Sequence, residues 1–371
     1  MSARSTQPSE AVVGKLSTLD RFLPLWIITA MAVGLGLGAL IPRLNHGLSS
    51  VQVSGTSLPI AIGLLLMMYP VLARVRYEQL GRLKAERGLF VSSLVLNWLI
   101  GPALMFTLAW LLLPDRPAYR TGLIIVGLAR CIAMVLIWSE LACADRDATA
   151  VLVAINSIFQ IFAYSLLGYF YITLLPRWLG LHSQGLHIGL WPVARTVLIF
   201  LGIPLAAGFL TRRMGLRARG QEWYEQRFLP RIGPIALYGL LFTIVLLFAI
   251  QGHQIIHHPL DVIRIAIPLL AYFAVMFVVS FGWGIALGLG YERTATLAFT
   301  AASNNFELAI AVAIGVFGVT SGQALAGVVG PLIEVPVLVG LVYVSLWARR
   351  FFPGQPNSGP VPGGEVSVQP G

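Results

Sequence analysis

Charged residues are scarce in this sequence. Asp, Glu, Lys and Arg together make up 11% of its 371 residues, whereas hydrophobic residues make up 57%. A soluble domain usually carries about 25% charged residues, so this composition excludes an ordinary soluble domain. The formal net charge of +10 would suit a nucleic-acid-binding protein, but the basic residues lie in short segments between apolar runs. This pattern is typical of a multi-pass protein in a lipid bilayer, and we predict no nucleic acid partner.

Cysteine is rare as well. Only Cys131 and Cys143 are present, both in or beside apolar sequence, which excludes a disulfide framework and a Cys-x-x-Cys metal site. We interpret Cys143, at the cytoplasmic end of its apolar run, as incidental. The six histidines all fall in predicted outer loops, so no histidine-based metal site is indicated.

Several functional signatures are missing. The sequence has no Walker A motif of an ATP-driven pump and no Asn-Pro-Ala pair of a glycerol-type channel. It also lacks the His-Glu-x-x-His and Gly-x-Ser-x-Gly motifs of proteases and hydrolases. We therefore expect no enzyme activity and no cofactor. What remains on physical grounds is a secondary carrier.

Long apolar runs are abundant, and ten of them can cross a membrane. We predict spans at about 23–42, 57–73, 88–113, 121–142, 148–175, 191–211, 232–250, 262–290, 294–317 and 322–347. Most Lys and Arg residues then lie in segments on one side of the membrane. By the positive-inside rule, both termini are cytoplasmic and the protein resides in a plasma membrane.

The predicted fold is an all-α polytopic membrane protein built from two inverted five-helix repeats. Its predicted parts are a cytoplasmic N-terminal tail at 1–22, the first repeat at 23–175, an outer connecting loop at 176–190, the second repeat at 191–347, and a disordered cytoplasmic C-terminal tail at 348–371. A weak internal similarity supports the repeat, because Arg120-Thr121 opens the fourth span as Arg293-Thr294 opens the ninth. At this offset Cys131 falls opposite Asn304. Transporters of this design bind substrate near the midplane, where a broken helix from each half meets the other.

The ninth span has a polar centre, formed by Ser303, Asn304, Asn305 and Glu307. A Glu at this depth costs at least ~2.5 kcal/mol on insertion scales, and such residues usually mark an ion or substrate path. The Asn pair disfavours continuous helix, so we expect the helix to break here. We interpret Glu307 as a proton- or cation-binding carboxylate. The alternative is a structural carboxylate that is protonated or hydrogen-bonded to the neighbouring Asn side chains.

Cys131 follows Arg130 in the middle of the fourth span. A lone buried Cys usually acts as a small hydrophobe. An Arg at membrane depth, however, must have a partner or line a cavity. Its positive charge favours the thiolate, which is the form that binds soft metals and metalloids. We therefore predict reversible substrate binding at Cys131.

Further polar residues within the spans could either line the site or only support the packing of the helices. They are Asn156, Gln160 and Tyr164 on one face of the fifth span, Ser139 and Glu140 near the inner end of the fourth, and Glu334 between two prolines of the tenth.

Four stretches carry a resemblance to a known family. They are PIAIGLLLMMYPVLARVRYEQLG at 59–81, GLARCIAMVLIWSELA at 127–142, AASNNFELAIAVAIGVFG at 301–318 and GVVGPLIEVPVLVGLVYV at 327–344. Over nearly its whole length the chain resembles the arsenite efflux permeases of the bile acid/arsenite/riboflavin transporter superfamily.

The resemblance implies crossed, broken helices in the fourth and ninth spans, and extrusion of arsenite, sometimes antimonite, in exchange for protons. It implies that Cys131 binds trivalent arsenic and that Glu307 couples transport to protons. In the mechanism that we infer, Arg130, Asn304 and Asn305 assist substrate binding. One departure is Ser139-Glu140, where we expect the family to show Asn followed by Asp more often. Two alternatives remain: a sodium-coupled importer of an organic anion, and a metalloid sensor that does not transport.

Overall fold

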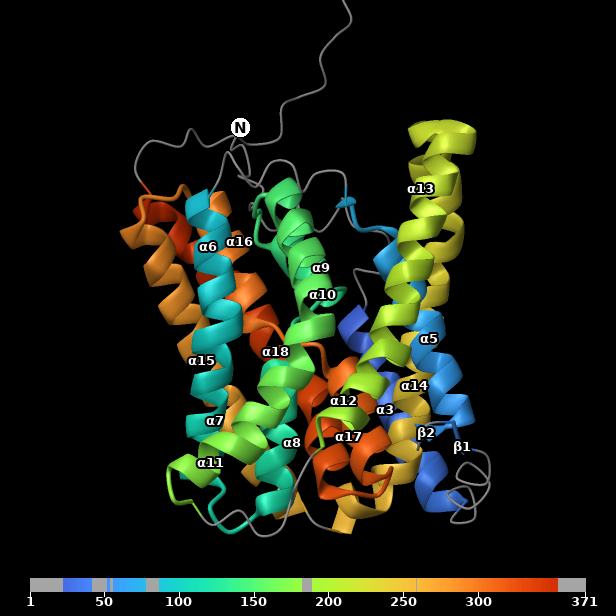
Figure 1. Ribbon diagram of the computed structural model, residues 1–371, viewed down its shortest axis with the longest axis vertical. Coiled ribbons are helices and arrows are strands. Elements are labelled where there is room, and N and C mark those ends of the chain that lie inside the picture. The colour runs from blue at the N-terminus through green and yellow to red at the C-terminus, as the bar shows by residue number, and fades with distance from the viewer. Residues whose placement is uncertain are drawn as a thin grey trace, which may run out of the picture.

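The computed structural model describes residues 23–41, 52–53, 56–77, 87–181, 189–257 and 259–352. The predicted N-terminal tail, the middle of the predicted outer connecting loop and the C-terminal tail after Phe352 lie outside these residues. The described chain is almost entirely helical (Figure 1).

The helices follow the predicted apolar runs. They are α3 (Leu23–Leu40), α5 (Leu58–Ala73), α6 (Arg87–Val95), α7 (Gly101–Leu112), α8 (Pro117–Leu128), α9 (Met134–Leu141), α10 (Arg146–Tyr169), α11 (Leu175–Trp178), α12 (Leu190–Val197), α13 (Ile203–Trp223), α14 (Leu229–His257), α15 (Pro259–Ala286), α16 (Tyr291–Ala302), α17 (Phe306–Phe317) and α18 (Gly322–Ala348). Short π-helical turns join some of them, at η2 (Leu96–Ile100), η3 (Phe170–Leu174), η4 (Leu198–Gly202) and η5 (Tyr224–Phe228), and a 3₁₀ turn, η6 (Arg349–Phe351), follows α18. Two short strands, β1 (Gln52–Val53) and β2 (Thr56–Ser57), pair antiparallel ahead of α5.

Within the described residues, five helical stretches are long and apolar enough to cross a membrane. They are Arg87–Leu112, Arg146–Trp178, Leu190–Gly252, Pro259–Ala286 and Gly322–Phe351. The stretch Leu190–Gly252 is not one straight helix, because its backbone leaves helical geometry at Gly220, where α13 turns back toward α14. The helices α3, α5 and α17 are shorter but equally apolar. Many large apolar side chains are exposed on these helices, among them Leu111, Phe162 and Val278. Such exposure is unusual for a soluble monomer and is expected where lipid covers the surface.

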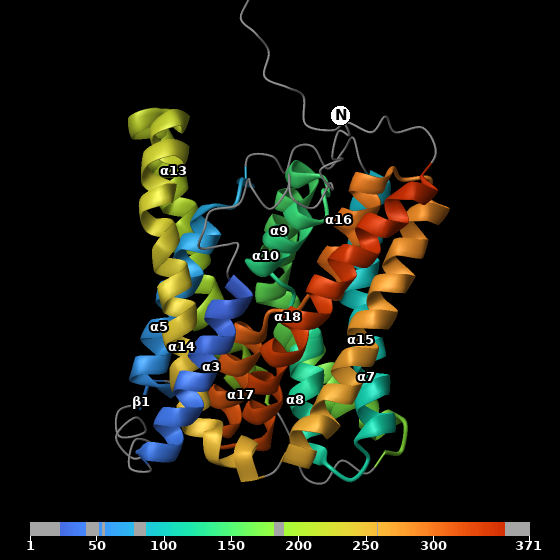
Figure 2. The same ribbon diagram turned by 180° about the vertical axis from the view of Figure 1, so that it is seen from behind.

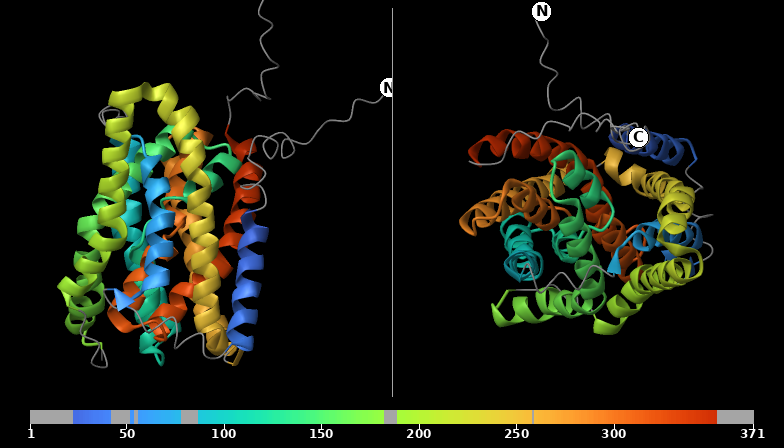
Figure 3. Two further views of the ribbon diagram at one scale, coloured as in Figure 1. Left: turned by 90° about the vertical axis from the view of Figure 1, so that its right-hand side faces the viewer. Right: turned by 90° about the horizontal axis from the view of Figure 1, so that it is seen from above.

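The helices form two groups that lie side by side (Figures 1 and 2). In the first helix group, α3, α5, α13 and α14 pack mainly on one another. Gly34 permits close packing of α3 on α14, because a Cβ added there would lie 2.6 Å from the backbone oxygen of Val245. The second helix group contains α6 to α10 and α15 to α18. The view from above in Figure 3 shows the first group along one side of the second.

Two predicted spans are each divided into two helices. In the ninth, α16 ends at Ala302 and α17 begins at Phe306, so the break expected around the Asn pair is present. In the fourth, α8 ends at Leu128 and α9 begins at Met134. Both breaks lie within the second helix group, and the residues of the candidate site are found at and between them.

Candidate functional site

The two breaks meet in the interior of the protein. Arg130 and Asn304 form an isolated antiparallel bridge, although they are far apart in the sequence. The backbone N–H of Asn305 donates to the carbonyl oxygen of Ala129 at 3.0 Å. The structure therefore brings together the polar centres that the sequence analysis singled out in the fourth and ninth spans.

Asn304 completes the carboxyl end of α8. A helix leaves its last carbonyl groups without partners inside the helix. The side-chain amide of Asn304 donates to the oxygens of Val126 and Ala129, at 2.9 and 3.2 Å. The Asn304 Oδ1 is buried and has no partner among the described residues. One end of this amide thus supports the helix, and the other end has no partner among the described residues.

Arg130 is completely buried, and its guanidinium points into the second helix group. It donates to the hydroxyl of Tyr272 at 3.0 Å, to the oxygen of Ala301 at 3.5 Å, and to the oxygen of Gly127. No carboxylate in the described part of the chain lies within ion-pair distance of it. The structure therefore uses this cation to hold α8, α15 and α16 around the break.

The amino end of α17 contains Asn305 and Glu307, the remaining residues of the polar centre of the ninth span. Asn305 caps the helix, because its Oδ1 accepts from the backbone N–H of Leu308 at 3.0 Å. Its Nδ2 is buried without a partner in the described structure. Glu307 lies in the first turn, where the helix dipole favours a carboxylate. The hydroxyl of Ser303 donates to the Phe299 oxygen at 2.6 Å and ends α16.

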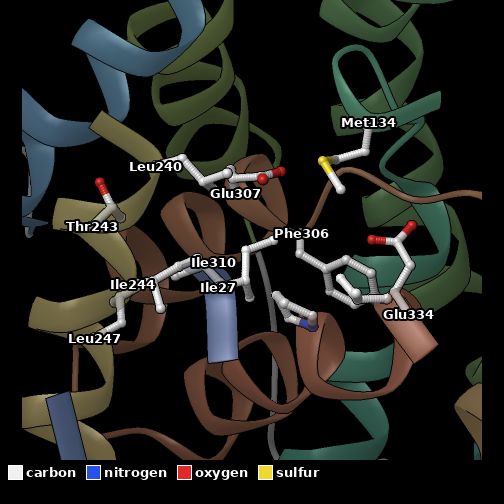
Figure 4. Close-up of a pocket in the computed structure, with 12 residues that line it drawn as sticks. Ile27, Met134, Leu240, Thr243, Ile244, Leu247, Phe306, Glu307, Ile310 and Glu334 are labelled. Atoms are coloured by element: carbon white, nitrogen blue, oxygen red, sulfur yellow. The ribbon is translucent and has the colours of Figure 1, made fainter. Parts of the chain in front are cut away.

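A small pocket, with about 30 Å³ of free space, lies between the two helix groups (Figure 4). Its lining from the first group is Ile27, Leu240, Thr243, Ile244 and Leu247, and its lining from the second is Met134, Phe306, Glu307, Ile310, Pro331, Glu334 and Val335. The described lining thus contains two carboxyls and no Lys, Arg or His. Such a pocket suits a neutral or cationic solute better than an anion.

Cys131 lies in the break between α8 and α9 and is 5% exposed. The Ser303 hydroxyl, which comes from the other break, lies near its thiol. It also lies close enough to Glu307 and Glu334 to be influenced by their charge. Cys131 does not itself line the pocket.

The secondary candidates lie around this centre. Glu334 lines the pocket and accepts a hydrogen bond from the Asn304 backbone at 3.1 Å. Gln160 accepts from the backbone N–H of Arg130, and Tyr164 donates to the Ile125 oxygen at 2.9 Å. Asn156 is one step further away, where it accepts from Trp98 Nε1 at 3.1 Å. The polar face of the fifth span thus supports the broken fourth span.

The sequence analysis missed several residues at the site. The pocket wall formed by Ile27, Leu240 and Ile244 could not be recognised, because apolar residues in apolar helices carry no distinguishing signal. Tyr272 was missed for a similar reason, since its helix α15 is rich in aromatic residues. Thr243 offered a signal, being a polar residue in an apolar run.

Comparison with known proteins places this architecture in a family. The model of the Sodium Bile acid symporter family matches residues 61–258. The Arsenical-resistance protein Acr3 of Corynebacterium glutamicum is 56% identical over 354 residues, which cover 95% of each chain. Acr3 of Alkaliphilus metalliredigens is 34% identical over 90% of this chain and 94% of its own. An uncharacterized transporter of Synechocystis is 37% identical over 93% of this chain and 92% of its own. The chain is therefore a multi-pass membrane protein of the Sodium Bile acid symporter family, a family of transporters, and it groups with the Acr3 arsenical-resistance proteins.

Proposed function

We propose that this protein is a secondary transporter that extrudes arsenite, and antimonite, from the cytoplasm in exchange for protons. The relative from Corynebacterium glutamicum, named for arsenical resistance, matches it over 95% of the chain. The observation that carries the proposal is the pocket, which combines two carboxyls with a sulfur-bearing wall and whose described lining has no basic residue. Arsenous acid is neutral and has a soft central atom, so it fits this chemistry.

The proposed topology has ten spans in two inverted repeats. The divided spans α8–α9 and α16–α17 support it, because each occupies the same position within its half of the chain. The basic segments place both termini in the cytoplasm of a plasma membrane. In this orientation the pocket lies between the two helix groups, and movement of one group against the other alternates its access.

Substrate binding centres on Cys131. The thiol exchanges with one hydroxyl of arsenous acid. An As–S bond forms, an As–O bond breaks, and the thiol proton leaves with the hydroxyl as water. The free Asn304 Oδ1 and Asn305 Nδ2 are positioned at the break to hydrogen-bond the remaining hydroxyls. Arg130 contributes by holding the break in shape, and the Ser303 hydroxyl lies near the thiol.

Proton coupling is assigned to Glu307. Its side chain faces the pocket from the first turn of α17, and no ion-pair partner for it is found in the described structure. A carboxyl in this position can take up a proton while the site faces outward and release it inward as substrate loads. Glu334, held by the Asn304 backbone, is the second carboxyl of the pocket.

Arsenite accumulation in everted membrane vesicles tests this function. An imposed proton gradient should drive uptake in the wild type, and an uncoupler should abolish it. Cys131→Ser and Glu307→Gln should both lose gradient-driven uptake at normal protein levels. Replacing sodium with choline should have no effect on arsenite uptake, whereas it would stop transport by a sodium-coupled importer of an organic anion. No accumulation by the wild type under any gradient would refute arsenite extrusion, and a sensor that only binds would give this result.

A further inference from the structure

Met134 brings a second sulfur atom to the pocket. It is the first residue of α9 and 8% exposed, and no other described residue of the lining contains sulfur. In Figure 4 its thioether points into the space between the carboxyls of Glu307 and Glu334. Cys131 precedes it by three residues and lies outside the pocket wall. A solute in the pocket therefore meets the thioether directly.

The two kinds of donor atom in this pocket prefer different partners. Carboxylate oxygens are hard ligands, which favour protons and hard cations, whereas a thioether is a soft ligand. The thioether of Met134 also binds no proton at ordinary pH, since its sulfur is only a weak acceptor. It can therefore contact a soft atom without competing for the protons of Glu307 and Glu334.

Methionine often fills irregular gaps in apolar cores, and Met276 illustrates that use. Met276 is completely buried in α15 and lines no part of the pocket. Met134 differs because it projects between two carboxyls at the boundary of the two helix groups. At this place the polarisable sulfur faces polar groups instead of filling a gap in an apolar core.

We propose that the Met134 thioether binds the trivalent metalloid inside the pocket, through a dative contact that forms before Cys131 captures the metalloid and persists afterwards. This inference rests on the proposed function and adds a residue that determines specificity. The sulfur supplies a lone pair, so no bond breaks and no proton is released at this step. The pocket thereby favours a solute with a soft centre over hydroxylated solutes that lack one.

The matched pair of variants is Met134→Leu and Met276→Leu. Leucine keeps a similar volume and removes the sulfur in both, so packing effects are comparable. In everted vesicles, Met134→Leu should raise the KM for arsenite and antimonite roughly tenfold, which corresponds to about 1.4 kcal/mol. Its maximal rate and proton dependence should remain at wild-type values. Met276→Leu should change none of these quantities. An unchanged KM in Met134→Leu would overturn the proposal.

A second measurement does not require transport. X-ray absorption at the arsenic edge, on detergent-purified protein loaded with arsenite, should show a second sulfur neighbour that is lost in Met134→Leu. A single sulfur neighbour in the wild type would also overturn the proposal. Failure of this inference is distinct from failure of the proposed function, because in the first case the wild type and Met134→Leu accumulate arsenite equally, and in the second neither does.

Discussion

The backbone N–H of Asn304 donates a 3.1 Å hydrogen bond to the carboxylate of Glu334. The break between α16 and α17 is thereby tied to the middle of α18. Glu334→Gln keeps an acceptor oxygen and removes the acid, whereas Glu334→Leu removes both. We expect Gln to preserve thermal stability in detergent and to weaken proton-driven uptake. Glu334→Leu should lower the free energy of unfolding by about 1–3 kcal/mol, because the buried N–H of Asn304 loses its partner. Equal melting temperatures for the two variants would contradict this role.

Asn305 serves two purposes that substitution can separate. Its Oδ1 caps α17, and its Nδ2 has no partner among the described residues and is proposed to contact the substrate. Asn305→Ala should lower stability by about 0.5–2 kcal/mol, whereas Asn305→Ser should retain the cap and most of the stability. Both variants lack the amide donor, so both should show a raised KM for arsenite. A KM for arsenite at the wild-type value in Asn305→Ser would contradict the proposed contact between the Asn305 amide and the substrate.

Gly330 lies where α18 passes the ring of Phe306. A Cβ at this position would lie 1.7 Å from a ring carbon, and Phe306 forms part of the pocket wall. We expect Gly330→Ala to displace the ring, costing about 1–3 kcal/mol of stability and most of the uptake. Gly340 in the same helix is the control, because a Cβ there meets no atom within 4 Å. In measurements of thermal unfolding and vesicle uptake, Gly340→Ala should match the wild type or slightly exceed it.

Tyr272 tests whether Arg130 supports structure rather than contacting substrate. Tyr272→Phe removes the hydroxyl that accepts from the guanidinium at 3.0 Å. Hydrogen bonds to charged groups contribute about 1.5–3 kcal/mol, so the melting temperature should fall clearly. The KM for arsenite should stay unchanged, because Tyr272 lies off the pocket wall. Tyr343→Phe, at a side chain that is 62% exposed, should have no effect on either quantity. A raised KM in Tyr272→Phe would show that Arg130 acts on the substrate.

Much of the fold follows from patterns in the sequence. Apolar runs of sufficient length gave the helices, and the Asn304-Asn305 pair marked one break correctly, because Asn competes with the helix for backbone hydrogen bonds. The break after Leu128 was less evident locally and was expected from the family resemblance. The packing of α3 and α14 in one group could not be derived, because lipid-facing and helix-facing surfaces are equally apolar.

The site was only partly predictable. Polar residues at membrane depth pointed to Glu307 and Cys131, since such residues are costly unless they have a role. The cost of a polar residue at membrane depth does not indicate the direction in which its side chain points. Arg130 could have faced a cavity or the protein interior, and only the positions of Tyr272 and Ala301 decide it. Met134 falls opposite Glu307 at the repeat offset, but this position does not show where its side chain points.

The hydrogen bonds described at the two breaks are all made within the second helix group, whereas α3 and α14 supply only side chains to the pocket wall. On the proposed function, we expect the second helix group to recognise the substrate and the first to control access to the pocket. If α3 and α14 slide or tilt, the entrance to the pocket moves, while the atoms that bind the substrate keep their mutual geometry. Substitutions at Leu240 or Ile244 should accordingly alter the transport rate. Substitutions at the two breaks should alter the substrate specificity.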